Sequence, residues 1–107
     1  MSRWYILDNN NKPVAKPVLE ASQWLKDNDN RRIVKRDEIG DILVSTVFLG
    51  LDHAWDSDIP VLWETMIFGG THDQEYQERY TSYEDALEGH EVAVEIAIKS
   101  LITKENG

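Results

Sequence analysis

The sequence contains no cysteine, and this absence excludes disulfide bonds and metal sites built from thiolates. A reducing compartment is compatible with such a chain, so we expect a cytoplasmic protein. Long hydrophobic runs are also missing. The longest apolar segment, Ile42 to Leu51, is interrupted by Ser45 and Thr46 and has about half the ~20 residues that a membrane-spanning helix needs. No basic region followed by an apolar stretch opens the chain, so the sequence predicts neither membrane insertion nor a secretion signal.

Basic residues are scarce and unevenly distributed. The chain has 11 Lys and Arg against 20 Asp and Glu, for a net charge of −9. Residues 1–36 hold eight basic and four acidic side chains, whereas residues 37–107 hold three and sixteen. Direct nucleic-acid binding is disfavoured because the overall field repels phosphates. The acidic half is either a solvated surface or a negative patch that attracts a basic protein or imitates a nucleic acid.

A chain of 107 residues has room for one modest core, so we predict a single domain over residues 1–107. The order of its predicted strands and helices indicates an α+β fold. An antiparallel meander of three to five strands is expected, covered by a long C-terminal helix and a shorter N-terminal helix.

Two apolar stretches, Val44 to Leu51 and Val61 to Phe68, predict the central hairpin, joined by a long polar loop. Arg31 to Arg36 is predicted as a preceding basic strand, with a turn over Asp37 to Asp41. Alternation places largely apolar residues on both faces of Val61 to Phe68. We therefore expect both faces to be covered, one by the helices and the other by a second copy of the chain.

The helices are predicted from their caps and their apolar spacing. Pro17 suits the start of the first helix, which we expect to end near Asn28. Thr81 and Ser82 are suitable N-caps for the last helix, and apolar side chains then recur at steps of three and four. Gly89 weakens that helix, so we expect it to mark a close approach to a strand or ligand, or the end of a first helical portion.

Several strings of residues resemble those of small uncharacterised bacteriophage proteins. The resemblance is carried by STVFLGLDH at Ser45 to His53, by WETMIFGG at Trp63 to Gly70, and by the residues that follow as far as His90. It covers about half of the chain. It implies a viral accessory protein that acts inside an infected bacterium, in the host cytoplasm, and it implies no particular activity.

Three histidines beside carboxylates give the chain a weak catalytic hypothesis. His53, His72 and His90 could form a metal-dependent hydrolase site if the fold brought them together. Their spacing matches no local metal motif, so we predict no metal ligand and no cofactor. No serine or threonine stands in a nucleophile motif either, and we predict no catalytic residue. Whether the chain is an enzyme stays open, and the residue pattern favours a protein that is not one.

A small-ligand site is the second class of function. Arg79 and Tyr80 would bind an anionic ligand such as a nucleotide, in a pocket built between subunits that Glu64 and His90 also line. If that ligand is a substrate, Glu64 within its apolar strand would act as the general base. The simpler interpretation pairs Glu64 with Arg79 across the sheet.

Protein binding without catalysis is the function that the sequence favours most. The expected partner is a host or viral protein. The candidate surface combines a tryptophan in the hairpin loop with the solvent-exposed, acidic face of the last helix. Its residues are Trp55, Glu84, Glu88, Glu91 and Glu95.

Overall fold

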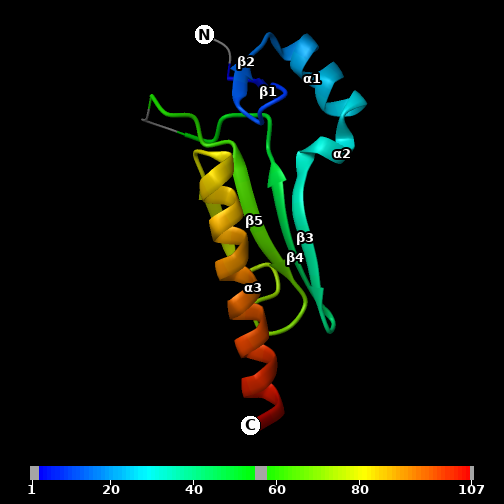
Figure 1. Cartoon of the computed structure of the whole chain (residues 1–107), viewed down its shortest axis with the longest axis vertical. Coiled ribbons are helices and arrows are strands. Elements are labelled where there is room, and N and C mark those ends of the chain that lie inside the picture. Colours follow the sequence, from blue (N-terminus) through cyan, green and yellow to red (C-terminus); the bar gives the residue numbers. More distant parts are fainter. Residues whose placement is uncertain (1–2, 55–57, 107) are drawn as a thin grey trace.

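The structure, a computed structural model, describes residues 3–54 and 58–106, the last four as backbone only. One long helix, α3 (Tyr83–Asn106), packs along a four-stranded antiparallel sheet (Figure 1). The strands follow one another in chain order as a meander, which confirms the predicted α+β architecture. They are β3 (Ile33–Ile39), β4 (Ile42–Phe48), β5 (Trp63–Phe68) and β6 (Gln77–Tyr80).

The N-terminal part caps one end of this sheet (Figure 1). It consists of the hairpin β1 (Tyr5–Leu7) and β2 (Pro13–Ala15), the helix α1 (Val18–Asp27) and the short helix α2 (Asp29–Arg32). Its buried side chains Leu7 and Leu25 join Phe48 and Trp63 of the sheet in one hydrophobic cluster. The two parts therefore share a core.

Several predicted boundaries are wrong, and β5 begins at Trp63 rather than at Val61. The basic segment Arg31 to Arg36 is not one strand, because α2 takes its first two residues and β3 then continues to Ile39. Ile39 pairs with Ile42, so the predicted five-residue turn shrinks to two residues. β4 ends at Phe48 rather than Leu51, because Gly50 has a φ of +79° that regular strand geometry does not allow.

The two faces of the sheet differ. Val44, Phe48, Trp63 and Ile67 are fully or almost fully buried on the face toward α3. The helix meets them with small side chains, including Ala86, Ala93 and Ala97. Short side chains allow the helix backbone to lie close to the strands.

The opposite face has no helix packed along it in the described residues. The residues of this open face, as the strand registers place them, are Leu43, Ser45, Val47, Glu64, Met66 and Phe68. Phe68 is 38% exposed. The expected helical cover of one face is confirmed, since α3 packs there. The cover expected on the other face was a second copy of the chain, and it stays a prediction.

The start of α3 follows the sequence prediction. The backbone N–H of Asp85 donates to Ser82 Oγ at 3.0 Å, so Ser82 is the cap. Gly89 makes the predicted close approach to a strand: a Cβ at this position would overlap the phenol of Tyr80 in β6. A glycine is required there although it weakens the helix.

Gly89→Ala should lower the free energy of unfolding by about 1–2 kcal/mol, because overpacking against Tyr80 outweighs the gain in helix propensity. Urea unfolding measures the change. In a Tyr80→Ala background, where the clash is gone, Gly89→Ala should instead stabilise by about 1 kcal/mol. Lys99→Ala on the exposed part of the same helix is the control. Stabilisation by Gly89→Ala in the wild-type background would contradict the close approach.

Candidate functional site

A line of hydrogen-bonded polar groups lies buried between α3 and the sheet. Thr65 and Thr46 share a hydrogen bond of 2.5 Å between their hydroxyls, and Thr46 Oγ1 lies 2.6 Å from His90 Nδ1. His90 Nε2 in turn lies 2.7 Å from Asp37 Oδ2. Asp37 of β3, His90, Thr46 and Thr65 form what we call the buried polar line.

The order acid, imidazole and hydroxyl resembles a nucleophile activated by a base, but here it has no access to a substrate. Thr46, Thr65 and His90 are all 0% exposed. Only the Asp37 side chain, 39% exposed, reaches solvent. The arrangement satisfies buried polar groups where the helix meets the strands, as the sequence predicted for His90. Sequence reasoning did not identify Asp37 and Thr46 as its partners, since they are far away in the chain.

The four predicted ligand-binding residues separate into two pairs. Arg79 Nε donates to Glu64 Oε2 at 3.0 Å on the open face, which is the simpler pairing expected from the sequence. Gln77 Nε2 also donates to that oxygen, at 2.7 Å. Tyr80 and His90 lie on the helix side of the sheet. The sheet therefore stands between the pairs, and they do not line one pocket.

Tyr80 itself is packed against the helix. Its hydroxyl is buried where β6 meets Gly89 of α3. Burial raises the pKa of Tyr80 above its usual range, and burial raises the pKa of Tyr76 likewise, with the negative charge of Glu78 adding to both shifts.

The three histidines do not converge. His53 donates its backbone N–H to the carbonyl of Val61, just before β5, whereas His72 lies in the turn that follows the other end of that strand. A six-residue strand separates these places by roughly 20 Å. Among the residues described, no group of three or more His, Asp and Glu side chains is placed to hold a metal ion.

The acidic face of α3 is fully accessible. Its four predicted residues, Glu84, Glu88, Glu91 and Glu95, are exposed. Lys35 of β3 pairs with Glu91 at 2.5 Å, and this hydrogen bond raises the pKa of Lys35. An exposed pair of this kind contributes little to stability. Trp55, the fifth predicted partner-binding residue, lies outside the described residues.

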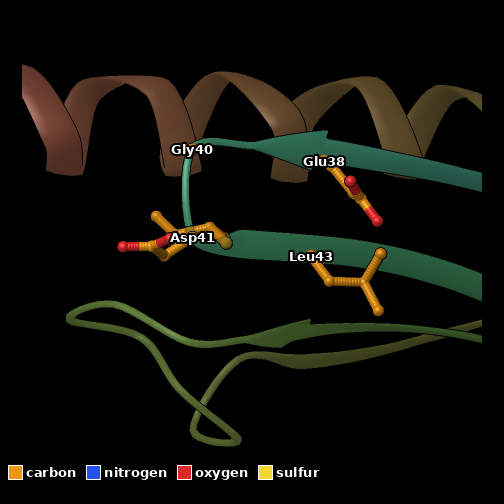
Figure 2. Close-up of a pocket in the computed structure, with 5 residues that line it drawn as sticks. Glu38, Gly40, Asp41 and Leu43 are labelled. Atoms are coloured by element: carbon orange, nitrogen blue, oxygen red, sulfur yellow. The ribbon is translucent and has the colours of Figure 1, made fainter.

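Two small hollows lie on the sheet among the described residues. One of about 70 Å³ lies in the open face between Val47, Glu64, Met66 and Phe68. Another, of about 250 Å³, lies open to solvent at the tip of the β3–β4 hairpin, where Figure 2 shows Glu38 and Leu43 projecting from neighbouring strands on one side. Pockets for drug-sized ligands measure about 300–1,000 Å³, so neither hollow encloses a nucleotide.

Comparison with models of known protein families, with curated proteins and with solved structures finds no match for this chain. In the described part of the chain, no helix is both long enough and apolar enough to cross a bilayer.

Thr46→Val should lower the free energy of unfolding by about 1–3 kcal/mol, because the isosteric side chain leaves His90 Nδ1 and the Thr65 hydroxyl without their buried partner. Chemical denaturation gives the value. Thr71→Val, at an exposed turn position, should change it by less than about 0.5 kcal/mol. Equal changes in the free energy of unfolding for the two substitutions would show that the buried polar line does not stabilise the contact between α3 and the sheet.

Alkaline pH should destabilise the fold through its tyrosines. The pKa values of Tyr76 and Tyr80 are higher in the folded state than in the unfolded state. Their contribution is therefore complete below a pH of about 10 and is lost as the pH rises through the raised values. Urea unfolding between pH 8 and 11 should show this loss, and Tyr80→Phe should reduce it. A loss of the same size in Tyr80→Phe and the wild type would exclude Tyr80 as a cause.

Proposed function

We propose that this chain is a small acidic bacteriophage accessory protein that acts by binding another protein in the host cytoplasm and not by catalysis. One observation supports the proposal. The open face presents apolar side chains to solvent, whereas the hydroxyl and imidazole groups of Thr46 and His90 are buried beneath α3. The phage origin rests on the resemblance of Ser45 to His90 alone.

The open face has the composition of a protein interface. Leu43, Val47, Met66 and Phe68 form its apolar centre. Polar side chains surround this centre: Arg36 and Glu38 lie across from Ser45 and Leu43 in β3, and Gln77 and Arg79 lie across from Met66 and Glu64 in β6. An apolar centre within a polar rim is typical of surfaces that bind proteins.

The acidic face of α3 would act at longer range. It lies on the other side of the two-layer domain, so one partner surface cannot contact both faces of the molecule. A field of net charge −9 nevertheless attracts a basic partner and increases its association rate. This predicts a basic surface on the partner and an association rate that falls as salt rises.

The alternative functions lack such support. Sequestration of a nucleotide needs an enclosed pocket, and the two hollows described above are small and open. A metal-dependent hydrolase needs His53, His72 and His90 in one place, whereas they lie at separate positions.

The test compares proteins retained from a bacterial lysate by immobilised wild type and by Phe68→Lys. A charge at Phe68, the open-face side chain that is 38% exposed, should reduce retention of a specific partner at least about tenfold, since desolvated interface residues carry most of the binding energy. Quantitative mass spectrometry of the retained proteins gives the ratio.

Leu19→Lys provides the matched control, because Leu19 is an apolar residue of α1 that is 82% exposed and lies outside the open face. It should retain the partner as the wild type does. The proposal fails if Phe68→Lys retains the same proteins as the wild type. It also fails if only neutralisation of Glu84, Glu88 and Glu95 releases the partner, since the acidic face of α3 would then be the contact surface.

A further inference from the structure

Strand β3 forms one edge of the sheet and leaves that edge unpaired. It contacts β4 on one side, with α3 and α2 as its other neighbours, and no strand of the described residues hydrogen-bonds to its outer side. An exposed edge of backbone N–H and C=O groups is a template for another strand unless charge or irregularity blocks it. The register of β3 shifts between Ile33 and Lys35, so the regular part of the edge is Lys35 to Ile39.

The side chains of this edge are arranged so that a second copy complements the first. Arg36 and Glu38 are two residues apart and therefore point to the same face, the open face. An antiparallel pair of identical strands has a two-fold axis perpendicular to the sheet, and residues directly opposite each other share a face. With the axis at Asp37, Arg36 lies opposite the partner's Glu38, and Glu38 lies opposite the partner's Arg36.

We propose that two copies of this chain pair antiparallel through β3, with two Arg36–Glu38 ion pairs across the junction. The four-stranded sheets then continue as one eight-stranded sheet, with both α3 helices on the same side. The two open faces join into one surface. This pairing stands independently of the proposed function.

The free charges on β3 support this pairing. Arg36 and Glu38 are both exposed, and neither makes an ion pair among the described side chains. Opposite charges directly across an antiparallel junction are favourable, so each would gain a partner. Asp37 meets its own copy at the axis, which is the unfavourable contact, but its carboxylate is already held by His90 Nε2 at 2.7 Å on the α3 side.

The neighbouring register is less favourable. With the axis at Arg36, two guanidinium groups would face each other, and Val34 would lie opposite the partner's Glu38.

The test uses two charge reversals, each of which should weaken dimerisation alone, whereas the two variants should dimerise with each other. Arg36→Glu places glutamates opposite one another, and Glu38→Arg places arginines opposite one another. Each variant alone should dimerise at least about tenfold more weakly than the wild type in sedimentation equilibrium. Mixed in equal amounts, they should form a heterodimer, because every position across the junction then pairs opposite charges. The double variant Arg36→Glu with Glu38→Arg should form homodimers again.

Lys26→Glu and Glu20→Arg, both on α1, are the controls, since they change the net charge by the same amounts at exposed positions away from β3. Both should dimerise as the wild type does. Circular dichroism verifies that each variant is folded, and formation of the heterodimer requires it.

Three results would overturn the pairing: a monomeric wild type, single variants that dimerise normally, or weakened single variants that mixing does not rescue. Normal dimers of both single variants that are lost with Phe68→Lys would assign self-association to the open face instead.

Discussion

The contact between α3 and one face of the sheet determines how the rest of the molecule is arranged. Small residues such as Ala93 and Ala97 bring the helix close to the strands, and Gly89 makes room for Tyr80. This packing buries the core and seals Thr46 and His90 away from solvent. Because the described chain has no second long helix, the same packing leaves the other face of the sheet exposed.

The buried polar line makes this packing specific. Apolar contacts alone tolerate a helix that slides along a sheet, whereas His90 has to reach Asp37 on β3 and Thr46 on β4 at the same time. Only one position of α3 satisfies both contacts. The exposed features then follow from this placement: an open face with an apolar centre, an acidic face on the outer side of α3, and a free edge at β3.

The sequence predicted what depends on local pattern. The central strands, the two longer helices, the Ser82 cap, the close approach at Gly89 and the Glu64–Arg79 pair were readable from residue type and spacing. The short strands β2 and β6 were not predicted. The partners of His90 were not, because Asp37 is 53 residues away and strand register decides which side chains meet. That Glu64 and Arg79 lie on one face of the sheet, and Tyr80 and His90 on the other, was not predictable for the same reason, because the strand register decides it. A helical turn at Asp29–Arg32 was missed because its residues have no apolar periodicity.

The absence of cysteine provides the most direct test of the central claim, that the open face is the binding surface. A single thiol at Val47→Cys reports on this face, and one at Glu88→Cys reports on the acidic face of α3. The measurement is the rate of maleimide labelling of each folded variant, alone and in bacterial extract, relative to a free thiol in the same extract. The account predicts that extract slows labelling at position 47 and leaves position 88 unchanged. Unchanged labelling at position 47, or protection at position 88 alone, would contradict it.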